Sequence, residues 1–174
     1  MTSEQLLEKV KVFYQSVYDL EENHKVGEWI FPLYGRFRTE QSRYLLSKER
    51  KLWEADGNEY VFFHICQTLN ESDGQQIDRL LREYIEPFYV RGGKETPPPN
   101  HMYSYITLIL ITEEKIGENM KDFVKKYKYY RNYRLSLRGY METRILLLSV
   151  GENRVISNRD GEELVPVLKR LLTE

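Results

Sequence analysis

Two short and continuously apolar runs dominate the pattern of hydrophobic and polar positions along the chain. They lie at 105–111 and 145–150. Both are too short to span a membrane, and neither leaves one face polar, which is typical of a strand that is covered on both sides. We interpret 103–150 as a central strand, a crossover helix and a second strand that is parallel to the first.

The N-terminal part of the chain has a helical and then an alternating pattern. Apolar residues recur at helical spacing from Ser3 to Leu20, and Thr2 and Gln5 have the spacing of a capping box. The polar segment 21–27 is expected to end this helix. Residues 29–31 and Pro32 then lead into an alternating run at 33–38, which predicts an edge strand.

The middle of the chain combines a turn signal, a second apolar stripe and a proline-rich segment. Asp56-Gly57 between the runs at 49–54 and 59–66 predicts an antiparallel hairpin. An apolar stripe that ends around Pro87 predicts a helix, with Ser72 and Gln75 at capping-box spacing. Residues 91–100 contain two glycines and three prolines, which favour an exposed connection.

The pattern at 154–157 predicts a short strand, and the spacing of the leucines between 164 and 172 predicts a last helix. The order of these elements predicts a single domain of residues 1–174 with an α/β (α+β) fold. We expect one mixed sheet with antiparallel N-terminal hairpins, a central parallel strand–helix–strand unit and helices on both faces.

Composition adds limits to this picture. The 174 residues are 41% hydrophobic and 30% charged, as in ordinary soluble proteins, and the net charge is −1. The single cysteine, Cys66, lies in an apolar run and is expected to pack. A single cysteine cannot form an internal disulfide, and this fact, together with the lack of an apparent signal peptide, favours a cytoplasmic, reducing setting.

Charge is segregated within the chain. Residues 121–144 hold eight basic and two acidic residues, a charge of +6, which leaves −7 for the rest of the chain. On a helical wheel, one face is core: Ile116, Met120, Phe123, Tyr127 and Tyr130. Basic residues beside exposed tyrosines predict contacts with phosphates and stacked bases, and the candidate nucleic-acid-binding residues are Lys121, Lys125, Lys126, Lys128, Tyr129 and Tyr133. The alternatives are a solvated helix face, or a patch that matches the acidic remainder of a second copy.

Glu113-Glu-Lys115 follows the first apolar run. Its acid-x-lysine spacing in a strand–helix–strand setting resembles metal-dependent nucleases of the restriction-endonuclease type, in which a carboxylate holds a divalent metal. The resemblance makes Glu113 and Lys115 the catalytic candidates. Those enzymes need a second carboxylate on a neighbouring strand, yet no aspartate lies between Asp78 and Asp122. A capping role and an inactive site are therefore expected.

Other chemistry is not indicated. His24, His64 and His101 have no metal-ligand spacing, so neither a metal nor a cofactor is predicted. His64 is expected inside the protein, and His101, beside the proline-rich segment, on the surface. No basic helix has an apolar face free of the core, so no membrane partner is expected.

Several short segments are similar to small uncharacterised proteins of Gram-positive bacteria. These are His101-Met-Tyr-Ser-Tyr105, Tyr133-x-x-Ser136-Leu-Arg-Gly-Tyr140, Arg144-Ile-Leu-Leu-Leu148, Tyr44-Leu-Leu and Trp53-Glu54. The resemblance implies no activity. Within it, Gly139 is expected to adopt a positive φ after the crossover helix, with Arg138 and Tyr140 at the start of the next strand. This loop and Glu113 should lie at opposite edges of the sheet.

The absence of a catalytic set, the segregated charge and the 14 tyrosines favour a non-enzymatic interaction or regulatory protein that associates with itself as a homodimer. The alternative is a nucleic-acid-binding domain of nuclease-like descent.

Overall fold

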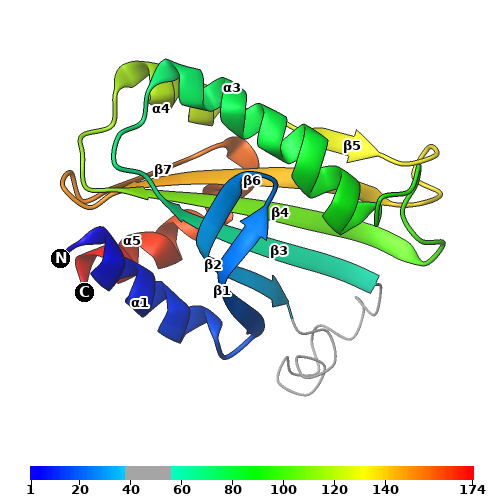
Figure 1. The fold of residues 1–174 in the computed structure, drawn as a ribbon, viewed down its shortest axis with the longest axis horizontal. Coiled ribbons are helices and arrows are strands. Elements are labelled where there is room, and N and C mark those ends of the chain that lie inside the picture. Colours follow the sequence, from blue (N-terminus) through cyan, green and yellow to red (C-terminus); the bar gives the residue numbers. More distant parts are fainter. Residues whose placement is uncertain (38–55) are drawn as a thin grey trace.

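A computed structural model of the chain describes residues 1–37 and 56–174 (Figure 1). These residues form one mixed sheet of seven strands in the order β1-β2-β3-β4-β6-β5, with β7 also paired to β6. Within the two described ranges, no helix is long and apolar enough to cross a membrane.

The three central strands of the sheet are parallel. The β3–β4 and β4–β6 pairs are parallel, and the other four pairs are antiparallel. The predicted parallel strand–helix–strand unit is thus confirmed as β4, α4 and β6. The strand bounds are Tyr18–Val26 (β1), Trp29–Phe37 (β2), Asp56–Ile65 (β3), His101–Thr112 (β4), Tyr130–Asn132 (β5), Tyr140–Ser149 (β6) and Arg154–Ser157 (β7).

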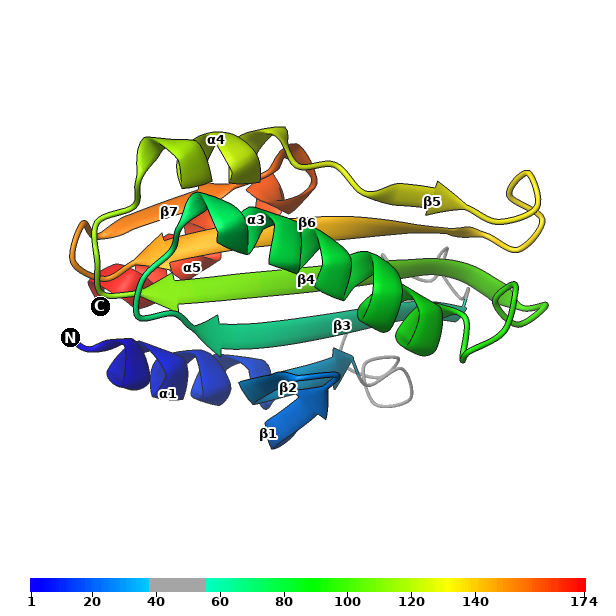
Figure 2. The ribbon, with the colours of Figure 1, turned by 45° about the horizontal axis from the view of Figure 1, so that its top comes forward.

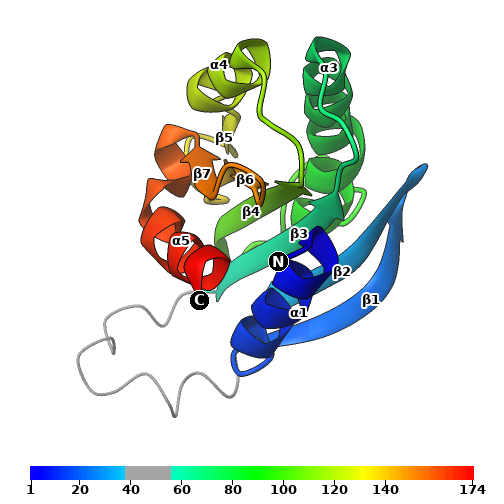
Figure 3. The same cartoon turned by 90° about the vertical axis from the view of Figure 1, so that its left-hand side faces the viewer.

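Helices cover both faces of the sheet, as predicted (Figures 2 and 3). One face carries α1 (Ser3–Tyr14) and α5 (Val165–Thr173), which follows the 3-10 turn η3 (Arg159–Leu164). The other face carries α4 (Glu118–Lys126) and a long helix made of α3 (Glu71–Arg79) and the π-helical η2 (Leu80–Val90).

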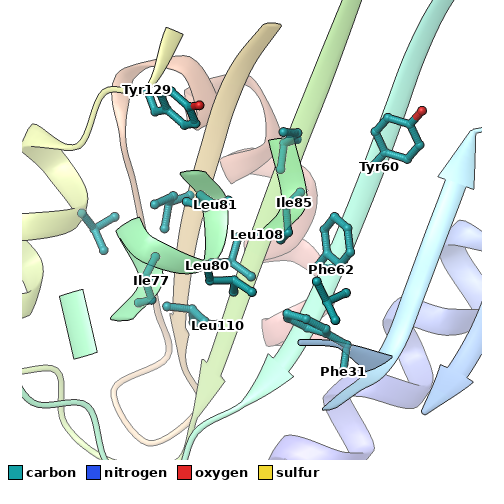
Figure 4. Close-up of a cluster of buried hydrophobic side chains, with 14 of the residues drawn as sticks. Phe31, Tyr60, Phe62, Ile77, Leu80, Leu81, Ile85, Leu108, Leu110 and Tyr129 are labelled. Atoms are coloured by element: carbon teal, nitrogen blue, oxygen red, sulfur yellow. The ribbon is translucent and has the colours of Figure 1, made fainter. Parts of the chain in front are cut away.

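The apolar run of β4 supplies both layers of the core. Leu108 and Leu110 point toward α3, η2 and α4, whereas Ile109 and Ile111 point toward α1 and α5. Figure 4 shows the first layer, in which helix residues such as Leu81 pack on the sheet. Two-sided burial is the physical reason why this run lacks a polar face.

The N-terminal region departs from the prediction. The capping box of Thr2 and Gln5 is present, but α1 ends at Tyr14, and the polar segment belongs to β1. β1 is the edge strand, so β2 lies between β1 and β3. Pro32 is tolerated in β2 because the β1–β2 pairing skips it, so its missing N–H is not needed. The pairs on either side are Glu22–Leu33 and His24–Phe31. Asn23, which lies between Glu22 and His24, has a positive φ of 54°.

Two further predictions need correction. Asn70, not Ser72, is the N-cap of α3, and its N–H donates to the Asp73 carboxylate at 2.6 Å. The helix also continues past Pro87 to Val90, because the wider π-helical turns relieve the crowding that a proline causes. The predicted partner strand at 49–54 lies outside the described residues, and β3 pairs with β2 and β4.

Candidate interaction surface

The basic crossover segment is only partly helical. α4 ends at Lys126, Tyr127 is extended, and the chain then enters β5. The helical wheel therefore fails beyond Lys126. Tyr129 and Tyr133 are buried, not exposed, and Tyr130, which we expected in the core, is 48% exposed.

The predicted basic residues are divided between core and surface. Lys121 was expected on the solvent face, but it is buried and its Nζ donates to Glu118 at 2.7 Å. Lys125, Lys126 and Lys128 are exposed. Lys126 and Lys128 line a groove of about 720 Å³ between α3 and α4. Three of the four predicted cations are thus exposed, but Lys121 is not, and the buried Tyr129 and Tyr133 offer no free ring for base stacking.

The buried Tyr133 belongs to a cluster around Glu86. This carboxylate has no exposed surface and accepts hydrogen bonds from Arg91 at 2.8 and 3.0 Å and from the Tyr133 hydroxyl at 2.5 Å. Arg131 lies 3.4 Å from it. Burial and the Glu86 contact raise the pKa of Tyr133. The cluster ties η2 to the loop after β5. It joins residues far apart in the sequence, so no local pattern predicts it.

The nuclease-like triplet has a structural contact. Oε1 of Glu113 accepts a hydrogen bond from the backbone N–H of Ser3 at 2.8 Å, so Glu113 caps α1. Lys115 is exposed. In the parts of the chain that the structure describes, no three His, Cys, Asp or Glu residues are grouped as a metal site requires. We expected the triplet to cap the helix that follows it, but Glu113 contacts the start of α1 instead.

The loop of Arg138, Gly139 and Tyr140 lies at the start of the parallel strands and Glu113 at their end, so the two are on opposite sides of the sheet, as predicted. Gly139 has a φ of 71°. It follows a hairpin loop instead of a helix, and β6 starts at Tyr140. His101 is buried, contrary to expectation, because its Nδ1 donates to the Arg138 carbonyl oxygen at 2.7 Å.

Cys66 and His64 are both partly buried. Burial raises the pKa of the Cys66 thiol to about 12, so the thiol stays protonated at neutral pH, in line with a packing role. Burial lowers the pKa of His64.

Sequence reasoning missed a group of four tyrosines on the sheet face that carries α1 and α5. We call Tyr103, Tyr105, Tyr130 and Tyr140 the tyrosine face. Tyr103 pairs with Tyr140 across β4 and β6, and the Tyr130 and Tyr140 rings stack with their centroids 5.7 Å apart. The signal that could have found them is the period of two in Tyr103-x-Tyr105 at the start of a strand.

Arg144 pairs with two carboxylates beside these rings. Its guanidinium lies 3.9 Å from the centroid of the Tyr105 ring, and it contacts Glu163 at 2.8 Å and Glu142 at 3.3 Å. Burial raises the pKa of Glu142, and Arg144 opposes this shift. Burial and the Tyr140 hydroxyl raise the pKa of Tyr105, so its hydroxyl is a neutral hydrogen-bonding group. The surface offers rings, hydroxyls and an excess of carboxylate, which suits binding.

The sequence profile of a domain of unknown function (DUF8052) matches residues 2–170. The chain belongs to this family. The match agrees with the predicted membership of an uncharacterised family. No curated protein and no solved structure matches the chain.

In this DUF8052 domain, β5 joins the tyrosine face to the basic segment. All three residues of the strand are exposed. Tyr130 belongs to the tyrosine face, whose carboxylates are Glu142 and Glu163. Lys128, Arg131 and Arg134, in or next to β5, are exposed cations. An acidic and a basic surface therefore meet at one edge of the sheet.

Proposed function

We propose that this DUF8052 domain is a non-enzymatic interaction domain that forms a homodimer along its β5 edge. The observation that carries the proposal is the exposed strand β5, where the tyrosine face, through Tyr130, adjoins the basic residues. An exposed aromatic residue at the centre of a patch is a common anchor of protein interfaces. A non-enzymatic role is supported by Glu113, whose carboxylate is used in capping α1.

A two-fold axis suits this arrangement of charge. In a two-fold symmetric dimer the same patch of both copies forms the interface, rotated by 180°. The acidic half of the patch in one copy then lies against the basic half in the other. Lys128 and Arg134 of one copy would then lie near Glu163 of the other. Such pairs at the rim favour the correct partner and the rate of association.

A charge-swap experiment tests this dimer. Lys128→Glu and Glu163→Lys each change one half of the patch at an exposed side chain. Glu163→Lys also removes the ion pair with Arg144 of the same copy, so the folding of this variant is checked separately. We expect each variant alone to sediment as a monomer because like charges then face each other. An equimolar mixture should restore the dimer. Lys9→Glu, at a partly exposed lysine on α1, is the matched control and should dimerise like the wild type.

The proposal fails if both variants dimerise as the wild type does, or if neither the single variants nor the mixture associate while the Lys9 control does. Circular dichroism of each variant separates lost association from lost folding.

A second candidate, nucleic-acid binding, is favoured by the exposed Lys125, Lys126 and Lys128. Because Tyr129 and Tyr133 are buried, the contacts would be made mainly with phosphates, and affinity would fall steeply with salt. Fluorescence anisotropy with single-stranded DNA and RNA tests this candidate. Unchanged binding by a Lys125→Glu/Lys126→Glu variant, or no binding at low salt, would remove it.

A further inference from the structure

The loop between β5 and β6, residues 133–139, has an unusual and well-fixed backbone. Arg134, Leu135 and Ser136 all have positive φ, at 49°, 53° and 68°, a conformation that L residues rarely adopt in succession. Asn132 holds the turn: its Oδ1 accepts from the Ser136 N–H at 2.6 Å, and its Nδ2 donates to the Ser136 Oγ at 2.7 Å. Consecutive strained residues are retained where the surrounding contacts specify them, and such strain is concentrated at functional sites.

This backbone directs two leucines into solvent. Leu135 is 93% exposed and Leu137 is 80% exposed. Met102, 53% exposed, lies at the base of the loop, where its backbone packs against Gly139. In Figure 2 the loop projects from the end of the β5–β6 hairpin, far from α1. We call residues 133–139 together with Met102 the apolar tip.

The stretch of sequence that contains the loop carries charge of one sign. Residues 123–141 contain six lysines and arginines and no aspartate or glutamate. Arg134 is exposed within the loop, and Arg138 is partly exposed. Apolar side chains flanked by basic ones, on a convex projection, match the interface of an anionic bilayer, where leucine reaches the acyl region and arginine meets phosphate headgroups.

Other occupants fit the apolar tip less well. Two copies that met tip to tip would bring Arg134 and Arg138 against the same residues of the partner, which repel. A nucleic acid would use the arginines but leave both leucines in water. The sequence predicted no membrane partner because that prediction considered only helix faces. Leu135 and Leu137 lie in a loop, which a helical pattern does not describe.

We propose that the apolar tip binds anionic lipid membranes by inserting Leu135 and Leu137 at the bilayer interface. The interaction is peripheral and reversible, because only one loop inserts. It does not depend on the β5 dimer.

Vesicle co-sedimentation tests the proposal. We expect the full chain to sediment with vesicles of phosphatidylglycerol and phosphatidylcholine, and to remain in solution with phosphatidylcholine alone. Leu135→Ser/Leu137→Ser should lower the partition coefficient at least about tenfold, since each leucine contributes through burial. Val12→Ser, an apolar residue of α1 that is 63% exposed, is the matched control and should bind as the wild type does.

A second measurement reports insertion itself. The indole introduced by Leu135→Trp should shift its emission to shorter wavelength on addition of anionic vesicles, relative to the wild-type signal. Absence of binding to anionic vesicles overturns the proposal. So does binding that the double leucine variant retains in full, because the basic residues alone would then account for it.

Discussion

The carboxylate of Glu113, just after the end of β4, accepts a hydrogen bond from the backbone N–H of Ser3, the first residue of α1, at 2.8 Å. The contact joins the central strand to a helix 110 residues away in the sequence. It satisfies one of the N–H groups that a helix leaves free at its start, and it places a negative charge at the positive end of the helix dipole.

Glu113→Ala should therefore destabilise the protein by about 1 kcal/mol, the usual cost of losing a helix cap. Urea denaturation followed by circular dichroism measures the change. Glu114→Ala removes the neighbouring exposed carboxylate and should have little effect. Equal effects of the two substitutions would show that the Ser3 contact does not stabilise α1.

Glu86 should be far more sensitive. Glu86→Ala leaves Arg91 and Tyr133 without their buried partner, and we expect a loss of about 3 kcal/mol in the free energy of unfolding. Glu83→Ala breaks an exposed pair with Arg79 in the same helix and should cost at most about 0.5 kcal/mol. If chemical denaturation gave similar values for the two variants, the buried cluster would not stabilise the fold.

Gly139 combines a positive φ with a tight contact. A Cβ at this position would lie 2.2 Å from the Met102 carbonyl oxygen, so Gly139→Ala should cost at least about 2 kcal/mol. Gly92 has a φ of 59° but no neighbour within 4 Å, so Gly92→Ala should incur only the backbone strain, about 1 kcal/mol. Thermal unfolding of both variants separates strain from steric clash.

Glu142 predicts a pH effect of definite sign. Its pKa is raised in the folded protein, so between the unfolded and folded pKa values the folded state binds more protons, and stability falls as pH rises through that window. Glu142→Gln should remove this loss and stabilise the protein more at pH 7 than near pH 4, relative to the wild type. Glu162→Gln removes an exposed carboxylate and is the control. A stability difference that does not change between the two pH values would contradict the shift.

The elements with two-sided burial were predictable from sequence. The runs of β4 and β6 are apolar at nearly every position because helices cover both faces. β1 was missed because its residues are largely polar and Asn23 interrupts the alternation. An edge strand of this kind has no clear periodic signal.

The candidate site was predicted less well, for a tertiary reason. Tyr129 and Tyr133 continue the helical spacing of α4, but the chain leaves the helix after Lys126. The Tyr127 carbonyl oxygen accepts from Asn158 at 3.3 Å, and the Tyr129 carbonyl accepts from the Thr143 N–H at 3.0 Å. Thr143 lies in β6 and Asn158 just after β7, so a pattern local to α4 cannot contain either partner.

The central claim is that the domain associates with itself through the β5 edge. Sedimentation equilibrium of the wild type over a range of concentrations at low salt tests it most directly. We predict that the apparent mass rises with concentration from 21.0 kDa toward twice that value, and that salt reverses the rise. A mass of 21.0 kDa at every concentration would contradict the account.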